Sequence, residues 1–254
     1  MVNGLEKWKE FFSGYLNNYV LIGGAACNVY EEEFAQPPRA TKDLDVVLVV
    51  EALSAEFCVK FWEFIISGNY SSRQRGADKH EYYRFMNPDN DSFPKQIELF
   101  ARSTGLLNIP REAHIEPIHV GDNISSLSAI LMNDDYYDYT VKHSTVIDGL
   151  HLASVDSLVC LKAKAYLDLD EKRESGTHVD KRDIEKHKKD VLRLTGMLAG
   201  DSRFSLPIGI KNDLRCFCDK VGTSLPNNDF MKSVGLGNVS AKDLLVLLME
   251  DFEL

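Results

Sequence analysis

The segment 43–50, DLDVVLVV, sets the strongest limit on the fold, because it is a run of apolar, mostly β-branched residues that opens on two acids. Such a run is typical of a strand buried on both faces of a sheet. An earlier apolar run, YVLIGG at residues 19–24, predicts a short strand that ends at two glycines, and AACNVYEEE after it predicts a helix. The Pro-containing stretch 34–42 must be a loop that joins this helix to the acidic strand.

The rest of the chain divides into a mixed half and a helical half. A helix is expected at 5–16 and another at 54–66, strands at 82–86 and 96–102, and extended segments at 134–141 and 143–154. From residue 154 onward the apolar spacing is helical, with further helices at 180–198, 208–221 and 241–252. We therefore expect an α+β chain: a mixed sheet with flanking helices over residues 1–153, followed by a helical domain over 154–254.

Composition excludes several classes of protein. With 254 residues, 44% of them hydrophobic, the chain can bury a large core. It contains no run of roughly 18 apolar residues and no signal-like N-terminus, so we expect a cytoplasmic protein without a membrane partner. Five cysteines without disulfide spacing suit a reduced compartment. A net charge of -10 disfavours a surface adapted throughout to phosphate backbones, although positive residues do cluster between 162 and 193.

The first candidate site is the acid pair Asp43 and Asp45. Side chains alternate along a strand, so both carboxylates lie on one face while Leu44 and Val46 point into the core. Two such acids repel each other unless a cation neutralises them, and magnesium prefers oxygen ligands completed by water and substrate phosphates. The competing interpretation is a pair of solvated turn residues before a strand.

Two glycines upstream strengthen the first interpretation. Gly23 and Gly24 fall between a strand and a helix N-terminus, where glycine lets backbone N–H groups and the helix dipole approach a phosphate. The order of strand, glycines, helix, loop and acidic strand predicts a triphosphate site beside a metal site. Thr41 and Lys42 are further candidates for phosphate contact, although Lys42 could simply balance the charge of Asp43.

A third carboxylate would complete a site for two metal ions, which need bridging ligands. Glu98 is the candidate, because it alternates out of an apolar strand between Ile97 and Leu99. It would face the same side as the aspartates if the two strands are neighbours. An ordinary solvent-facing strand position is the alternative.

These segments, GGAACNVY, TKDLDVVLVV and QIELF, resemble the signature of the nucleotidyltransferase superfamily that includes DNA polymerase beta. Within it, the chain is most similar to the AbiEii-type abortive-infection toxins, over most of its length. The similarity continues in the helical half, at Lys162 with Ala165 and at Arg182, Asp183 and Asp190 in KRDIEKHKKDVLRL. It implies that Lys162 offsets the charge of the triphosphate and that Asp183 contacts the base, the ribose or the attacking hydroxyl. A solvated, salt-bridged helix face would explain Asp183 and Asp190 equally well.

The resemblance implies an enzyme that moves a nucleoside monophosphate from a nucleoside triphosphate to an acceptor hydroxyl, with two magnesium ions. The acceptor would be RNA, protein or a small molecule, and an antitoxin protein would be a partner. One departure is that Ala25 follows Gly24 where the family has Thr or Ser. This departure leaves open a nucleotide-binding module without catalysis. The acidic surface, which suits a cationic acceptor, leaves open a small-molecule transferase of the aminoglycoside-modifying type.

Overall fold

The computed structural model describes residues 3–34, 41–72, 83–100, 133–200 and 202–254. Its first half contains, in chain order, α1 (Leu5–Phe12), the 3-10 helix η1 (Leu16–Asn18), β1 (Tyr19–Ile22), α2 (Gly23–Glu33), β2 (Asp43–Leu48), the 3-10 helix η2 (Val50–Ala52), α3 (Ala55–Ser67), β3 (Ser71–Ser72), β4 (Tyr83–Met86), β5 (Gln96–Phe100), α5 (Asp134–Lys142), β6 (Ser144–Ile147) and β7 (Leu150–Ala153). Its second half contains α6 (Val155–Glu174), α7 (Lys181–Thr195), α8 (Ile208–Thr223), α9 (Asn228–Ser233) and α10 (Ala241–Asp251).

The strands form one seven-stranded mixed sheet in the order β3-β4-β5-β2-β1-β7-β6. The central strand, β2, is antiparallel to β1 and parallel to β5, and β1 is parallel to β7. Every residue of β1 is buried, as expected for an inner strand covered on both faces. The predicted fold class, a mixed sheet with flanking helices followed by a helical segment, is confirmed.

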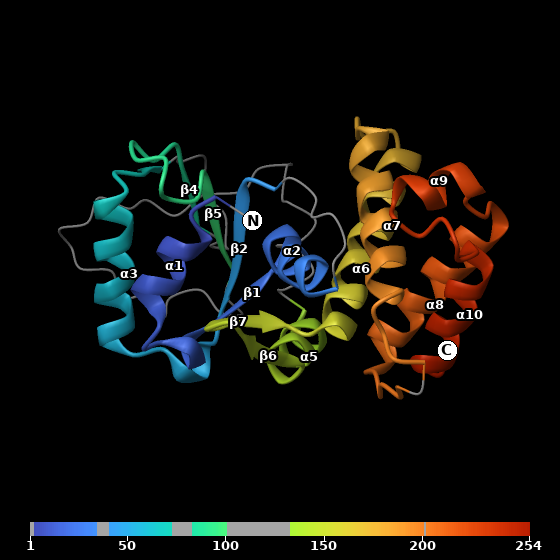
Figure 1. The fold of residues 1–254 in the computed structure, drawn as a ribbon, viewed down its shortest axis with the longest axis horizontal. Coiled ribbons are helices and arrows are strands. Elements are labelled where there is room, and N and C mark those ends of the chain that lie inside the picture. The colour runs from blue at the N-terminus through green and yellow to red at the C-terminus, as the bar shows by residue number, and fades with distance from the viewer. Residues whose placement is uncertain (1–2, 35–40, 73–82, 101–132, 201) are drawn as a thin grey trace.

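Aromatic side chains attach α1 and α3 to the sheet. Trp8 and Phe12 of α1 meet Phe64 of α3 with ring centroids 5.4 Å apart in each case, and all three rings are fully buried. Edge-to-face and tilted contacts of this kind stabilise aromatic pairs beyond simple area burial. In Figure 1, α1 and α3 lie on one side of the central strands, and α2 lies on the other, between the sheet and α6.

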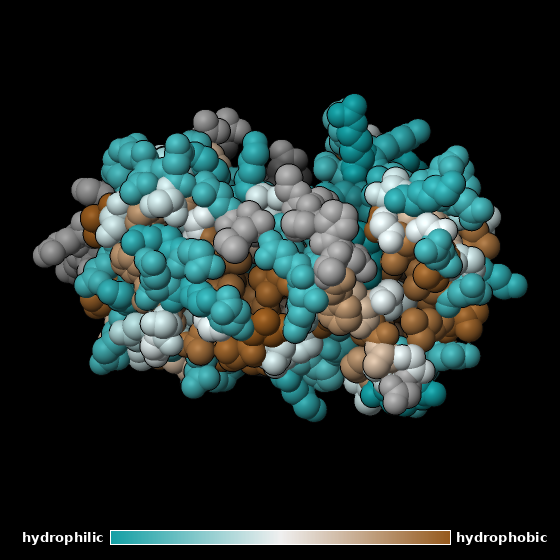
Figure 2. Space-filling view, viewed as in Figure 1, coloured by the Kyte–Doolittle hydropathy of each residue, from teal (hydrophilic) through white to brown (hydrophobic). Residues whose placement is uncertain are grey.

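The helical half is built around α6 and α7. These two helices pack closely against each other, and α8 also packs on α6. Lys220 of α8 binds Asp170 of α6 at 2.7 Å. Figure 2 shows hydrophilic residues spread over both halves of the visible face, with hydrophobic residues gathered near its lower centre and towards the α8–α10 end. None of the helices in the described ranges is both long and apolar enough to cross a bilayer.

One sequence prediction was wrong in kind. The segment 134–141, expected to be extended, is the helix α5. Asn133 caps it by accepting hydrogen bonds from the backbone N–H groups of Asp135 and Tyr136, and acids fill its first turn. Such caps and first-turn acids stabilise a helix start. The extended segment predicted at 143–154 is confirmed, and it contains the antiparallel strands β6 and β7. Most of the predicted loop 34–42 lies outside the described residues.

Candidate active site

The acid pair lies at the start of the central strand. Asp43 is the first residue of β2, and Asp43 and Asp45 are both half-buried, whereas Leu44 and Val46 between and beyond them are fully buried. This alternation confirms that the two carboxylates share one face of the sheet. The paired strand β1 ends opposite Asp45, where Ile22 is its register partner. The pair therefore lies beside the point where the chain leaves β1 and enters α2.

Gly23 begins α2 with a φ of 67°, in the left-handed region that favours glycine. A Cβ atom built on Gly23 would lie 1.8 Å from Oδ2 of Asp45, far inside van der Waals contact. The first glycine is therefore required both by its backbone conformation and by the carboxylate against it. This contact places the N-terminus of α2, where backbone N–H groups lack helical partners, directly beside the acid pair. Gly24 follows inside the helix and is buried.

Glu98 lies on the strand next to the acid pair, as predicted. In the parallel pairing of β2 with β5, Asp45 is the register partner of Glu98 and Asp43 that of Gln96. Glu98 is buried, so the alternative of a solvent-facing position is wrong. Its Oε1 accepts hydrogen bonds from Arg84 Nε and from Gln96 Nε2, each at 2.8 Å, and lies 2.7 Å from Nη2 of Arg84. The closest partner of this acid is thus a guanidinium group.

Two lysines from the helical half act on the acid pair. Lys162 of α6 is buried, and its Nζ lies 3.3 Å from Oδ2 of the buried Asp190 of α7. The positive charges of Lys162 and Lys186 both lower the pKa of Asp45. Lys162 thus lies close enough to Asp45 to act on its charge, and it is paired with an acid of the next helix.

The electrostatics of Asp45 are those of an acid with too little positive charge around it. Burial is the largest cause that raises its pKa, the negative charge of Glu98 is the next, and Asp43 adds to both. Together they outweigh Lys162 and Lys186 and bring the pKa of Asp45 to about 7. Burial also raises the pKa of Glu98, against the opposing effect of Arg84. A cation beside Asp45 would relieve this cost.

The acid pair fits a hard divalent cation by its donors. Two carboxylates on one strand face, one of them with a strongly raised pKa, supply the oxygen ligands that magnesium takes, with water and phosphates completing the shell. Within the described ranges, however, no three His, Cys, Asp or Glu side chains gather closely enough to hold a metal ion. The donors therefore fit a metal site formed by two aspartates. Oε1 of Glu98 already accepts hydrogen bonds from Arg84 and Gln96.

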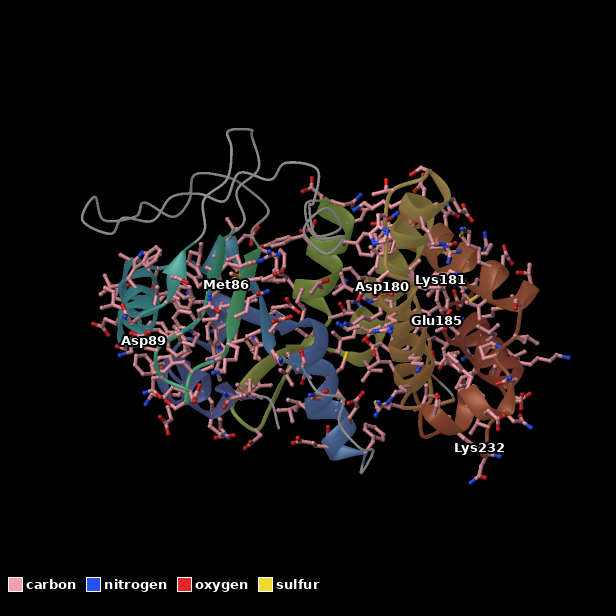
Figure 3. The ribbon with its side chains drawn as sticks, turned by 90° about the horizontal axis from the view of Figure 1, so that it is seen from above. Met86, Asp89, Asp180, Lys181, Glu185 and Lys232 are labelled. Carbon is pink, nitrogen blue, oxygen red and sulfur yellow. The ribbon has the colours of Figure 1, made fainter. Side chains whose placement is uncertain are left out.

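A basic hollow lies on the helical side of the site. Its volume is about 440 Å³, and it is lined on α7 by Lys181, Arg182, Glu185, Lys186 and Lys189. Figure 3 shows Asp180, Lys181 and Glu185 together on the N-terminal part of this helix. Lys186 belongs both to the hollow and to the surroundings of Asp45, so the hollow and the acid pair are neighbours. Phosphate groups suit such a lining.

The remaining candidates are less involved. Asp183 is exposed in the first turn of α7, whereas Asp190 two turns later is buried, so the predicted stripe of acids does not share one environment. Thr41 and Lys42 directly precede β2, half-buried and exposed respectively. Arg84 is the site residue that the sequence did not reveal. The only signal for it is a charged residue inside the apolar strand YRFM, and its role needs the pairing of β4 with β5.

The comparisons with known proteins give a distant likeness to a solved structure. No protein-family model and no curated protein matches the chain. Among solved structures, the chain is similar to the crystal structure of an antigenic nucleotidyltransferase-like protein from Paracoccidioides brasiliensis. The sequence identity is 14%, the TM-score is 0.45, and the match covers 91% of this chain and 93% of that one.

Proposed function

We propose that this chain is a magnesium-dependent nucleotidyltransferase, which moves a nucleoside monophosphate from a nucleoside triphosphate to an acceptor hydroxyl. The observation that carries the proposal is the contact between Asp45 and Gly23, which sets an acid pair against a helix N-terminus. Acids and a helix N-terminus have opposite charge preferences, since the latter attracts anions. A metal–triphosphate ligand satisfies both, because its cation suits the acids and its phosphates suit the helix.

Different residues would bind the metal ion and the phosphates of this ligand. Asp43 and Asp45 would hold the magnesium ion, which when bound supplies Lewis-acid polarisation of the phosphate oxygens. The backbone N–H groups at Gly23 and Gly24 would bind a phosphate, and Lys162 would add a fixed positive charge. The acceptor oxygen then attacks the α-phosphorus in line, and the bond to pyrophosphate breaks. Positioning and charge compensation account for most of the rate in such a reaction.

The basic hollow on α7 supports an anionic ligand next to the acid pair. Four of its five lining residues on α7 are Lys or Arg, in a chain whose net charge is -10. Asp183, exposed at the start of the same helix, is proposed to contact the sugar, the base or the attacking hydroxyl. Thr41 and Lys42 are proposed phosphate contacts at the entrance of β2. The role as an abortive-infection toxin, and an antitoxin partner, remain predictions from the sequence resemblance.

The test is transfer of label. Purified protein is incubated with magnesium, a cell lysate and each α-labelled nucleoside triphosphate in turn, beside the isosteric variants Asp43→Asn and Asp45→Asn. We expect covalently attached label with the wild type, and a loss of about 100-fold or more with either variant, because each removes a metal ligand. Sensitivity of the product to nuclease or protease then identifies the class of acceptor.

The matched control is Asp229→Asn, which changes a highly exposed acid on α9 by the same chemistry and should keep full transfer. Full activity in Asp43→Asn or Asp45→Asn would show the mechanism to be wrong. Label that binds reversibly, without release of pyrophosphate, would favour the binding module without catalysis.

A further inference from the structure

Oε1 of Glu98 has no accepting capacity left for a metal ion. Three nitrogen atoms surround Oε1: Arg84 Nε and Gln96 Nε2 at 2.8 Å, and Arg84 Nη2 at 2.7 Å. A carboxylate oxygen offers about two lone-pair directions, so these N–H groups use all of its accepting capacity. Bonds between an ionised donor and an ionised acceptor are also the strong ones. Glu98 is therefore committed to Arg84 through this oxygen.

The sheet register makes this commitment a consequence of the fold. Arg84 is the register partner of Glu98 in the antiparallel pair β4–β5, and Asp45 is its partner in the parallel pair β2–β5. Side chains of directly paired residues lie on the same face of a sheet. A row of guanidinium, carboxylate and carboxylate thus runs across three neighbouring strands. Arg84 compensates Glu98 from one side, and Asp45 on the other side is the acid that still needs a cation.

Charge balance points to a single divalent ion. Asp43, Asp45 and Glu98 carry three negative charges and Arg84 returns one positive charge, which leaves no more negative charge than one divalent ion neutralises. Lys162, although paired with the buried Asp190, and Lys186 offset a further part of the negative charge around Asp45. The spacing of acids agrees, since no three metal-binding side chains come together in the part of the chain that the structure describes.

We infer that the site binds one divalent ion through Asp43 and Asp45, and that Glu98 is a positioning residue which holds Arg84. The guanidinium supplies the second positive charge of the site. Its side chain is 32% exposed, so part of it faces solvent, while Nε and Nη2 contact Glu98. Guanidinium is permanently charged and matches phosphate oxygens through its fork of N–H groups. The inference rests on the proposed function for the identity of that ligand, a nucleoside triphosphate.

The test counts bound ions without any turnover. Mn²⁺ titration followed by electron paramagnetic resonance, in the absence of nucleotide, should give one ion per wild-type chain. Glu98→Gln should keep that ion and weaken its binding by less than about tenfold, the effect of one lost neighbouring charge, because Glu98 is not a ligand. Asp45→Asn should lose it.

Removal of the Arg84 guanidinium should strengthen Mn²⁺ binding. In Arg84→Gln the Glu98 carboxylate stands uncompensated beside Asp45, so we expect Mn²⁺ to bind at least about fivefold more tightly, or a second ion to appear. Adding Glu98→Gln to this variant should abolish the gain. The matched control is Lys220→Gln, which takes a positive charge from the distant α6–α8 ion pair and should leave Mn²⁺ binding unchanged.

The ligand side of the inference is measured separately. Arg84→Gln should weaken binding of a non-hydrolysable α,β-methylene nucleoside triphosphate by about tenfold, the effect of losing one charge-assisted contact. Glu98→Gln should weaken it less, and Glu98→Asp should restore part of the loss if the acid acts by positioning Arg84.

Three outcomes would overturn the inference: two ions on the wild-type chain, a loss of Mn²⁺ affinity of about tenfold or more in Glu98→Gln, or analogue binding unaffected by Arg84→Gln. A chain that binds no Mn²⁺ would overturn the proposed function as well. One ion, a loss of Mn²⁺ affinity of less than about tenfold in Glu98→Gln and weaker analogue binding in Arg84→Gln, together with no transfer of label, would sustain the inference while the transferase proposal fails.

Discussion

At the scale of a single residue, Gly23 makes the tightest contact of the site. We predict that Gly23→Ala destabilises the chain by about 1–2 kcal/mol, because alanine is strained at a φ of 67°. The new methyl group also meets Oδ2 of Asp45, so the carboxylate must move. Misplaced ligands typically cost 10-fold to about 100-fold in metal affinity, and we expect a loss in this range by Mn²⁺ titration.

Gly176→Ala separates the two effects of that change. Gly176 also has a positive φ, of 90°, but a Cβ atom there would meet nothing within 4 Å. In urea unfolding its alanine variant should show the loss of stability that the strained backbone causes by itself, and its Mn²⁺ binding should be normal. Equal Mn²⁺ affinities in the two alanine variants would mean that the contact with Asp45 is unimportant.

Asp45 should make the stability of the metal-free chain fall as pH rises. Its pKa is about 7 in the folded chain, with burial the largest cause, against an ordinary value of 3.8. Between these two values the folded state binds more protons than the unfolded state, so the free energy of unfolding decreases with increasing pH. After allowance for partial exposure, we expect this one group to account for about 2 kcal/mol between pH 4 and pH 8.

The variant Asp45→Asn isolates this contribution, because an amide stays neutral throughout. Urea unfolding in EDTA should show the variant gaining stability relative to wild type between pH 5 and pH 8. Magnesium should reduce that gain at pH 8. Asp229→Asn, at an exposed site on α9, should have the same free energy of unfolding as the wild type at pH 5 and at pH 8. A parallel course of the wild-type and Asp45→Asn curves would contradict the raised pKa.

At the scale of elements, the sequence predicts the elements whose patterns are local. The run 43–50 and the segment QIELF carry strand-forming residues, and residues 43–48 of the first and all of the second form neighbouring strands. The failure at α5 has a physical cause. Its aromatic residues alternate with acids over part of the segment, yet Tyr136, Tyr137, Tyr139 and Thr140 are all buried, a spacing that only a helix capped by Asn133 gives.

Only those features of the candidate site that depend on a single strand could be predicted from the sequence. Asp43 and Asp45 share a face because alternation is a property of one strand. Arg84 could not be assigned, because its meeting with Glu98 depends on the register between β4 and β5. The pairing of Lys162 with Asp190 likewise depends on how α6 packs against α7. Contacts between elements are set by the whole fold, which one segment does not encode.

The ion pair between α2 and α7 should be costly to break on one side. Arg193 Nη2 lies 3.3 Å from Glu31 Oε1, and the two side chains are only 10% and 3% exposed. Arg193→Met leaves the Glu31 carboxylate buried without this partner, and we expect a loss of about 3 kcal/mol in urea unfolding. The double variant with Glu31→Leu should recover most of that loss.

Lys232→Met is the matched control, because its partner Asp229 and the lysine itself are both highly exposed. Exposed pairs contribute about 0–1 kcal/mol, so little change is expected there. A double variant as unstable as Arg193→Met alone would mean that lost packing, rather than the stranded charge, causes the destabilisation.

At the scale of the whole molecule, the two halves should unfold together. Both tryptophans, Trp8 and Trp62, are buried in the first half, whereas long helices dominate the second. Tryptophan fluorescence therefore reports the sheet half, and far-UV circular dichroism mostly reports the helical half. Because α2 packs on α6 and is tied to α7 by Glu31 and Arg193, we expect coincident urea midpoints. Loss of the dichroism signal at lower urea than fluorescence would show two separate units.

The position of β2 as the middle strand of the sheet has a consequence for local unfolding. Partial opening of a sheet starts at its edges, and β3, a strand of two residues, forms the edge next to β4. Fraying from that side releases Arg84 on β4 before it reaches Glu98 on β5, and it reaches Asp43 and Asp45 last. On gentle heating, the Arg84 guanidinium would thus leave the site while Asp43 and Asp45 still hold their positions. Affinity for the nucleotide would then decline before affinity for the metal ion.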